Sequence, residues 1–273
     1  MTAPVFANSA LVKAPERFVL REAPWRQRAL WVRYGLYLGA ASGPVLIDTG
    51  YTSHALHDAG RSAALRFYGR ALGASLQPRG QPVPFLARHG LRPEEITTVV
   101  VTHFHADHVS GLRLFPNARF IAARAGWDAL RAHGTLGNLR HAVFPELLPP
   151  DFADRLDPIE RKPAVRTDHG TAYDLMGDGA LLALPLPGHA VGHVGLLFTR
   201  LAKPLLYAVD TQWMLAALPA PRRPGFPAML VATDRAAQAR SCDLVAGVAA
   251  AGGDVLLCHD PTPTIYDEAA PCA

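Results

Sequence analysis

Residues 102–108 read Thr-His-Phe-His-Ala-Asp-His, which places three imidazoles and one carboxylate between positions 103 and 108. The residues before them, Ile-Thr-Thr-Val-Val-Val at 96–101, are β-branched throughout and predict a buried strand. Val-Ser-Gly at 109–111 predicts a turn into a helix. The polar cluster therefore stands where a core strand ends, a place at which a rigid element holds a loop open to ligands.

Imidazole nitrogens and carboxylate oxygens are the ligands that hold zinc, iron or manganese in enzyme sites. Because a loop does not force neighbouring side chains onto opposite faces, His103 and His105 can bind one ion while Asp107 and His108 bind a second. The alternative is a polar loop with coincidental histidines. Only 12 of the 273 residues are histidine, so three within so short a stretch favour a metal site.

The composition predicts a folded protein that binds neither nucleic acid nor membranes. Hydrophobic residues make up 49% of the chain, enough for a large core, and charged residues only 18%, too few for a disordered chain. The net charge is +4, but no basic run with interleaved aromatic residues occurs. No apolar run reaches the roughly 18 residues that span a bilayer, and the N-terminus lacks the pattern of a signal peptide.

The cysteines predict the compartment. Cys242, Cys258 and Cys272 are an odd number and show no CxxC spacing, which indicates reduced thiols in a cytoplasmic protein. Cys258 precedes His259 and could be a metal ligand, although a buried thiol in an apolar strand is the more usual role.

Short apolar runs alternate with helical patterns in two blocks, on either side of about 135–165. This alternation predicts an α/β (α+β) protein in which two sheets pack face to face with helices outside, forming one four-layer domain over residues 1–273. Residues 1–15 are expected to be an extended lead-in. The expected strands are 16–22, 29–38, 45–47, 96–101, 118–122, 171–176, 180–186, 194–199, 205–209 and 254–258, and the expected longer helices are 53–76, 126–133 and 228–250.

Two segments stand out from this alternation. Residues 53–90 predict a helical insert, whose apolar face includes Phe67 and Leu72. Residues 134–166 contain several prolines and little periodicity, which predicts an irregular cover over the site.

Three further residues of ligand type follow apolar strands directly. His189 comes after Leu-Pro-Gly, Asp210 ends Leu-Tyr-Ala-Val, and His259 ends Val-Leu-Leu-Cys. Each alone is more often a solvated or capping polar residue. Together they indicate one shared rim at which a metal site is completed.

These motifs resemble those of the metallo-β-lactamase superfamily, and the resemblance runs from about residue 30 to 260. The stretches that carry it are L-I-D-T-G at 46–50, T-H-F-H-A-D-H-V-S-G at 102–111, L-P-G-H-A-V-G-H at 186–193, A-V-D at 208–210 and C-H-D at 258–260. The resemblance implies an αββα sandwich with a dinuclear metal site at the edge between the sheets.

The resemblance also implies a role for each residue. One metal ion would be bound by His103, His105 and His189, and the other by Asp107, His108 and His259, with Asp210 as the bridge between them. Asp48, His193 and Asp260 would orient these ligands. The ions would be two divalent metals, zinc in the first place, with manganese or iron as alternatives.

Two such ions share a water molecule and lower its pKa, so that hydroxide exists at neutral pH. One ion polarises the substrate carbonyl, and Asp107 next to the nucleophile can transfer a proton. The implied function is a hydrolase that attacks a carbonyl ester of a small molecule. A homodimer is left open.

Within the superfamily, the set of five histidines and two aspartates resembles the N-acyl-homoserine lactone lactonases. Enzymes that cleave β-lactams usually lack a bridging aspartate such as Asp210, and the chain lacks the C-terminal extension, exosite arm or flavodoxin domain of other branches. One departure is Trp213, which stands where these lactonases commonly have a carbonyl-binding tyrosine. Tyr68 or Tyr207 could replace that hydroxyl, and Phe67, Tyr68 and Trp213 are the expected substrate contacts.

Other functions remain open from the sequence. Thioesters and phosphodiesters are alternative substrates for the same fold. A mononuclear iron dioxygenase acting on persulfides would use part of the same ligand set. A non-catalytic binding module would normally have lost ligands, whereas all of them are present here.

Overall fold

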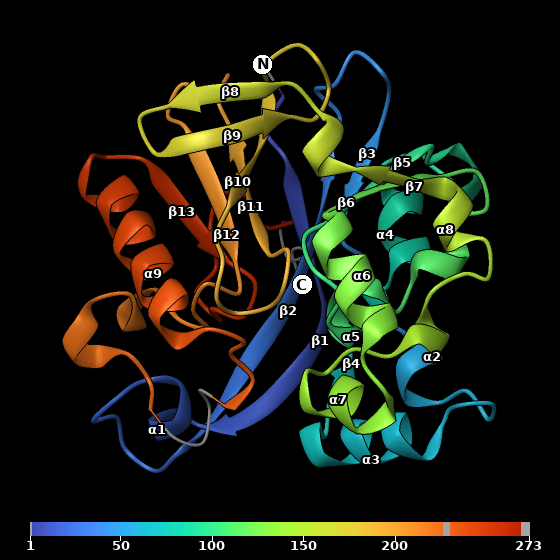
Figure 1. Ribbon diagram of the computed structural model, residues 1–273, viewed down its shortest axis with the longest axis vertical. Coiled ribbons are helices and arrows are strands. Elements are labelled where there is room, and N and C mark those ends of the chain that lie inside the picture. The colour runs from blue at the N-terminus through green and yellow to red at the C-terminus, as the bar shows by residue number, and fades with distance from the viewer. Residues whose placement is uncertain (1, 226–229, 269–273) are drawn as a thin grey trace.

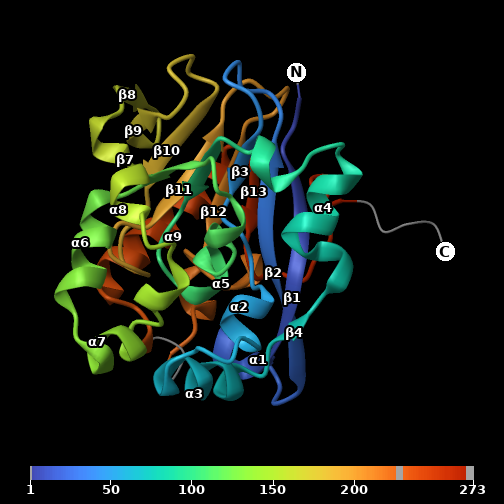
Figure 2. The ribbon, with the colours of Figure 1, turned by 90° about the vertical axis from the view of Figure 1, so that its right-hand side faces the viewer.

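The computed structural model describes residues 2–225 and 230–268, and it consists of two sheets packed face to face (Figures 1 and 2). The larger sheet has the strand order β4 (Ser75–Leu76), β1 (Val5–Pro15), β2 (Gln27–Tyr37), β3 (Val45–Ile47), β5 (Thr98–Val101), β6 (Arg119–Ala122) and β7 (Leu156–Pro158). The smaller sheet has the order β13 (Asp254–Leu257), β12 (Leu205–Val209), β11 (Val194–Phe198), β10 (Leu181–Pro185), β9 (Gly170–Asp174) and β8 (Ala164–Thr167).

Helices cover both outer faces, which confirms the expected four-layer αββα arrangement. Helix α9 (Arg235–Ala250) lies on the smaller sheet, where its Cys242, Val245 and Val248 join an apolar cluster with residues of β10 and β12. Helices α4 (Pro82–Arg88) and α6 (Arg124–Ala132) lie on the larger sheet. The main core fills the space between the two sheets and is built from fully buried side chains such as Phe6 and Phe198. In the part of the chain that the structure describes, no helix is both long and apolar enough to cross a membrane.

The N-terminal segment differs from the sequence-based expectation. The expected extended lead-in is strand β1, which pairs antiparallel with β2 along most of its length. Residues 16–22, expected as a strand, instead contain helix α1 (Glu16–Val19). Pro15 precedes this helix, and the carboxylate of Glu16 in its first turn pairs with Arg26. This local turn reverses the chain between β1 and β2, and its short length leaves no helical periodicity to detect.

The insert over residues 53–90 is helical but interrupted. The expected helix 53–76 is split into α2 (Ser53–Leu56) and α3 (Ala63–Leu72). Helix α3 begins because the Ser62 hydroxyl accepts a hydrogen bond from the Leu65 amide at 3.1 Å, and it ends at Gly73, whose φ of 56° is left-handed.

Residues 134–166 are more regular than their prolines predict. They contain α7 (Thr135–Arg140) and α8 (Phe152–Arg155), and then β7 and β8, which form the edges of the larger and the smaller sheet. This segment therefore carries the chain from one sheet to the other. Farther on, the expected helix 228–250 begins only at Arg235, where the Asp234 carboxylate accepts from the Ala237 amide at 2.9 Å. Residues 226–229 and Cys272 lie outside the described residues.

Arg33 on β2 is a fully buried arginine that ties the C-terminal segment to the larger sheet. Its Nε and Nη2 donate to the Asp267 carboxylate at 2.7 and 3.1 Å. The remaining donors reach the backbone carbonyls of Leu257, Asp260 and Thr262. Because these carbonyls lie on both sides of position 259, the guanidinium fixes the backbone that carries His259.

Arg33→Met should destabilise the protein by about 3–5 kcal/mol, because the Asp267 carboxylate and three backbone carbonyls would lose their partner. Urea denaturation measures the change. The matched control is Arg92→Met: Arg92 pairs with Glu95 at 3.1 Å, but its side chain is 76% exposed, so about 0.5 kcal/mol or less is expected. Equal losses in the two variants would contradict this role for Arg33.

Candidate metal centre

The polar residues predicted from the sequence meet at one edge of the two sheets. His103 and His105 follow β5, and Asp107 and His108 lie on the short helix α5 (Ala106–Val109). The larger sheet thus supplies one side of the cluster. His189 follows β10, Asp210 follows β12 and His259 follows β13, so the smaller sheet supplies the other side. All seven side chains are at least nine-tenths buried.

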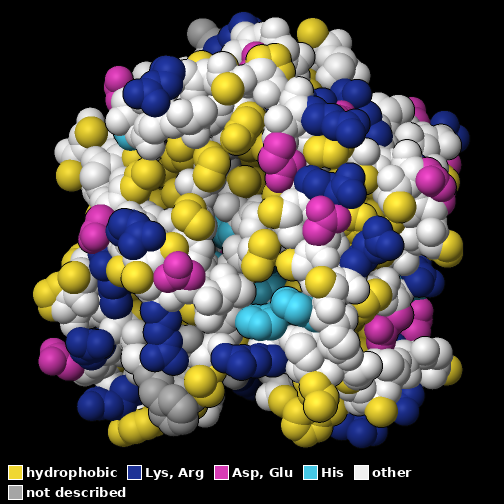
Figure 3. Space-filling view, viewed as in Figure 1, with side chains coloured by type: hydrophobic (Ala, Val, Ile, Leu, Met, Phe, Trp, Pro, Cys, Tyr) yellow, Lys and Arg dark blue, Asp and Glu magenta, His cyan; other side chains and the backbone are white. Residues whose placement is uncertain are grey.

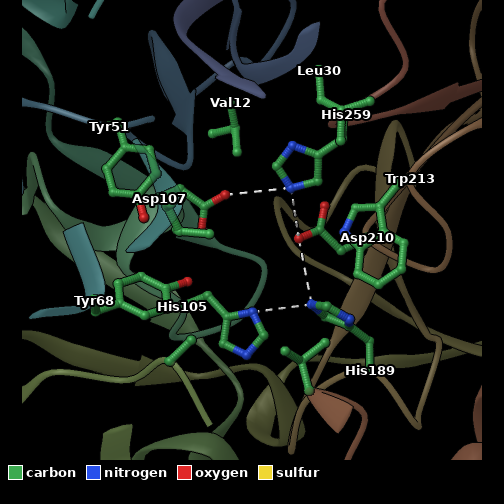
Figure 4. Close-up of a pocket in the computed structure, with 13 residues that line it drawn as sticks. Val12, Leu30, Tyr51, Tyr68, His105, Asp107, His189, Asp210, Trp213 and His259 are labelled. Atoms are coloured by element: carbon green, nitrogen blue, oxygen red, sulfur yellow. Dashed lines mark hydrogen bonds and ion pairs between the residues drawn. The ribbon is translucent and has the colours of Figure 1, made fainter. Parts of the chain in front are cut away.

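Asp210 is the centre of the cluster. Its Oδ2 lies 3.2 Å from His108 Nε2, 3.4 Å from the Nε2 atoms of His189 and His259, and 3.5 Å from His103 Nε2 (Figure 4 draws the pairs with His189 and His259). Its Oδ1 is buried and has no hydrogen-bond partner among the described residues. One carboxylate therefore contacts four imidazoles and still has a free oxygen.

The other two predicted ligands complete the cluster from opposite sides. His105 Nδ1 lies 3.0 Å from His189 Nε2. Asp107 Oδ2 lies 3.4 Å from His259 Nε2 and 3.7 Å from His108 Nε2. The structure thus brings all seven predicted ligands together at one place.

These distances fit divalent metal ions. Two nitrogens bound to one tetrahedral zinc at about 2.0 Å lie about 3.3 Å apart, close to the His105–His189 separation of 3.0 Å. Two sets of ligand atoms each fall within 4.8 Å of one another: His103, His105, His189 and Asp210; and His108, Asp210, Cys258 and His259. His103 Nε2 is buried without a hydrogen-bond partner among the described residues, as a metal-binding nitrogen would be.

The pKa values of the clustered side chains bear on their ability to bind cations. Burial, together with the neighbouring histidines, holds the pKa values of His103 and His105 well below the usual range, so both are neutral and can donate a lone pair. Burial alone would raise the pKa of Asp210, but His259 and His108 outweigh it and hold that pKa well below its usual value. At His108 and His259 the neighbouring acidic groups, Asp210 among them, outweigh burial and raise the pKa values well above the usual range. The cluster therefore presents the neutral imidazoles of His103 and His105 beside an ionised Asp210.

Asp48 fixes the orientation of His108. This fully buried carboxylate accepts hydrogen bonds from the Thr102 amide and hydroxyl, both at 2.8 Å, and pairs with His108 Nδ1 at 2.9 Å. Because Nδ1 is engaged by Asp48, Nε2 is the atom that faces Asp210. Asp48 has a φ of 57°, a left-handed conformation that aspartate tolerates better than most residues.

His193 and Asp260 act on the backbone of the site. Burial and the nearby His189 lower the pKa of His193 to about 3, so its neutral ring donates from Nδ1 to the Leu186 carbonyl at 2.8 Å and accepts the Asp210 amide at Nε2 at 3.3 Å. Asp260 accepts backbone amides at both oxygens, from Leu215 at 2.7 Å and Thr262 at 2.9 Å. Asp260 therefore holds the loop after His259, whereas the resemblance implied that it orients a metal ligand.

Two features of the centre leave no pattern in the sequence. His259 Nδ1 is held by the backbone carbonyl of Trp31 at 2.6 Å, so its orienting partner is a main-chain atom. Val209 has a φ of 52°, which is strained for a β-branched residue, and it stands where the pairing of β12 with β13 shifts register. This strained residue turns the chain so that Asp210 points into the cluster.

The cluster opens into a pocket with mostly apolar walls (Figure 4). Figure 3 shows histidine side chains near the middle of one molecular face. The pocket is lined by Val12, Leu30, Tyr51, Tyr68, Leu72, His105, Asp107, Ala142, His189, Asp210, Trp213, Val231 and His259.

The pocket contains two of the three expected substrate contacts. Tyr68 and Trp213 line it, whereas Phe67 is 63% exposed and lies outside it. The expectation for Phe67 is wrong because α3 turns its Tyr68 and Leu72 inward, four residues apart, and so directs Phe67 to solvent. Tyr207 also lies elsewhere, since its hydroxyl donates to the Arg33 carbonyl at 3.2 Å.

The described part of the pocket also contains a residue that the sequence did not indicate. Tyr51 follows the Asp48 turn and is 1% exposed, yet its ring reaches the pocket. The signal in the sequence that could have pointed to Tyr51 is its position three residues after Asp48, the acidic residue that follows strand β3.

Comparisons with known proteins agree with this fold and site. The profile of the metallo-beta-lactamase superfamily matches residues 35–211, so the chain belongs to that superfamily. An N-acyl homoserine lactonase AttM of Azorhizobium caulinodans is 32% identical over 177 residues, a match that covers 63% of this chain and 61% of that protein. A second N-acyl homoserine lactonase AttM, of Rhizobium radiobacter, is 33% identical over 156 residues, covering 55% and 54%. The chain thus spans less than two thirds of the length of these relatives.

Solved structures share the fold over nearly the whole chain. An AiiA mutant of B. thuringiensis, with N-decanoyl-L-homoserine bound at its active site, superposes with a TM-score of 0.72 at 19% identity, covering 96% of this chain and 95% of that chain. At this identity the likeness shows the αββα fold alone.

Asp48→Asn should lower the affinity for divalent metal by about 10- to 100-fold, because an amide orients His108 less strongly than a carboxylate does. Asparagine also tolerates the left-handed backbone at this position, so the variant tests the charge. Competition with a chromophoric chelator measures the affinity.

The control for that measurement is Asp174→Asn. Asp174 is also a buried carboxylate that accepts three backbone amides, but it caps a turn far along the smaller sheet. It should lose stability and keep its metal affinity. Unchanged affinity in Asp48→Asn would contradict the orienting role of Asp48.

Proposed function

We propose that this protein is a dinuclear metal-dependent hydrolase that opens lactones. The observation that carries the proposal is the Asp210 carboxylate, whose Oδ2 lies within 3.5 Å of four histidine Nε2 atoms at the base of an apolar pocket. A buried carboxylate surrounded by imidazole nitrogens is suited to bridging two cations.

The two groups of side chains would each hold one ion. His103, His105 and His189 supply nitrogens on one side of Asp210, and Asp107, His108 and His259 supply the ligands on the other. The donor types suit zinc, with manganese or iron as alternatives. When bound, such ions would polarise a carbonyl and supply hydroxide at neutral pH.

The chain's own residues would do the remaining work. Asp107 Oδ2 lies at the edge of the pocket, 3.4 Å from His259 Nε2, and so stands where it can accept a proton from the attacking water and pass it to the leaving oxygen. The leaving alcohol and the new carboxylate stay in one molecule, because the substrate is a ring. Leu72, Val12 and Leu30 offer apolar walls that would exclude water and hold an acyl chain.

The substrate class is supported by two independent features. The pocket walls are apolar apart from a few polar groups, as a ring with an acyl tail requires. Relatives over the matched region are named N-acyl homoserine lactonases. Thioesters and phosphodiesters are the competing substrates, because the same metal-bound nucleophile could attack them.

The test is a hydrolysis screen on protein whose metal content is measured. We expect close to two divalent ions per chain and ring-opening of N-acyl homoserine lactones, with slower or no turnover of thioesters, phosphodiesters and a β-lactam. The inactive control is Asp210→Asn. Because a neutral amide compensates the charge of two cations poorly, this variant should bind less metal, and its turnover should fall by orders of magnitude.

The outcomes separate the alternatives. Turnover of thioesters or phosphodiesters but of no lactone would overturn the substrate and leave the dinuclear centre. One iron per chain with oxygen uptake would indicate the persulfide dioxygenase. Protein without bound metal after growth with metal supplied would overturn the centre itself.

Trp213 would bind the substrate by packing. It lies on the pocket wall three residues after Asp210 and is partly buried against Val19, Leu20 and their neighbours. Trp213→Ala should therefore raise KM more than it lowers kcat, because it removes contacts that the ground state and the transition state share. Lactone kinetics measures both constants, and a loss of kcat alone would contradict this role.

A further inference from the structure

The pocket contains two phenol hydroxyls that the proposed hydrolysis does not yet use. Beyond the metal-binding groups, the polar side chains among the described lining residues are those of Tyr51, Tyr68 and Trp213. Figure 4 shows both tyrosine hydroxyls on the side of Asp107 and His105, with Trp213 on the opposite side of the cluster.

Tyr51 is held rigidly and its hydroxyl is unpaired. Its backbone amide donates to the Ser9 hydroxyl at 2.9 Å, and its carbonyl accepts from the Gln81 side chain at 3.1 Å. The residue is 1% exposed, and the hydroxyl has no hydrogen-bond partner among the described residues. A buried hydroxyl without a partner is unfavourable, and a hydrogen bond to the neighbouring Tyr68 hydroxyl would offset this cost.

Tyr68 presents its hydroxyl to the same space. Its ring packs against Phe144 with a centroid separation of 5.1 Å, on the inward face of α3. Burial and the nearby Asp107 carboxylate raise the pKa of Tyr68, and burial with the neighbouring Tyr68 and Asp107 raises the pKa of Tyr51. A phenol has an ordinary pKa of about 10, so both hydroxyls are protonated at neutral pH and are donors, which a developing oxyanion requires.

We propose that Tyr68 donates a hydrogen bond to the substrate oxygen on which negative charge develops, and that Tyr51 positions Tyr68 by donating to its hydroxyl. The inference rests on the proposed function for the identity of the reaction. The geometry itself concerns any substrate that develops an oxyanion beside Asp107. Tyr68 is the catalytic residue of the pair, and Tyr51 acts through it.

The burial of the two tyrosines indicates which hydroxyl contacts the substrate. Tyr51 is fully buried, whereas Tyr68 is only partly buried on the insert helix α3, which forms a pocket wall. A substrate entering the pocket therefore meets Tyr68 first. If Tyr51 donates to Tyr68, the oxygen of Tyr68 is polarised and its own proton points to the substrate.

The experiment measures binding as well as turnover. Metal-loaded wild-type protein, Tyr68→Phe, Tyr51→Phe and the double variant are titrated with phenylphosphonate, a tetrahedral oxyanion, by calorimetry at neutral pH. Lactone kcat and KM and bound metal are measured on the same preparations. The control is Tyr34→Phe, because Tyr34 is also fully buried with an unpaired hydroxyl but does not line the pocket.

We expect Tyr68→Phe to weaken phenylphosphonate binding and to lower kcat about tenfold or more, as loss of a hydrogen bond to a charged group predicts. Tyr51→Phe should show a smaller loss, and the double variant should equal Tyr68→Phe. Tyr34→Phe should leave binding, kcat and metal content unchanged.

The other possible results distinguish the roles of the two tyrosines. Unchanged phosphonate binding in Tyr68→Phe, with metal retained, overturns the role of Tyr68. Losses that multiply in the double variant overturn the positioning role of Tyr51. If the wild-type protein opens no lactone, but Tyr68→Phe still weakens phenylphosphonate binding, the lactone assignment is overturned and the role of Tyr68 as a hydrogen-bond donor is supported. If Tyr68→Phe fails to fold, unchanged binding in Tyr51→Phe still overturns the pair.

Discussion

The structure depends on one buried carboxylate. Asp210 Oδ2 contacts imidazoles that come from both sheets, since His103 and His108 follow a strand of the larger sheet and His189 and His259 follow strands of the smaller one. All these distances are at most 3.5 Å, so the edges of the two sheets must keep their separation to within a fraction of an ångström. The core between the sheets sets that separation, and the polar groups around the centre fix the rest.

Those surrounding groups share one arrangement: each engages the face of a ligand that points away from the centre. Asp48 engages His108, the Trp31 carbonyl engages His259, and His193 holds the amide of Asp210. Arg33 extends the same arrangement outward by binding the carbonyls on both sides of His259. Burying polar groups is unfavourable unless each has a partner, and these orienting atoms are all paired. In contrast, His103 Nε2 and Asp210 Oδ1, which face the proposed ions, have no hydrogen-bond partner among the described residues.

The sequence predicted that these ligand-type residues would cluster because they follow apolar strands. The run from His103 to His108 and the isolated His189, Asp210 and His259 all stand where a pattern of β-branched or apolar residues stops. In contrast, the helix at Glu16–Val19 is a single turn fixed by its contact with Arg26, and one such turn is too short to leave a helical periodicity in the sequence. The conformation of Val209 is likewise imposed by tertiary structure against its own preference.

The pocket was harder to predict, and the reason is physical. Its walls come from β1, β2, helix α3 and the loop after Asp210, and their contribution depends on which face of each element points inward. On α3, rotating the inward face by one residue would place Phe67 in the pocket instead of Tyr68, and the sequence predicted both as substrate contacts. The metal-binding residues are fixed by strand ends, whereas the substrate contacts are fixed by the rotation of a helix. Substitutions on α3 and at Trp213 can therefore change which substrate binds while the metal-binding residues stay the same. For this reason, membership of the superfamily indicates the type of reaction more closely than it indicates the substrate.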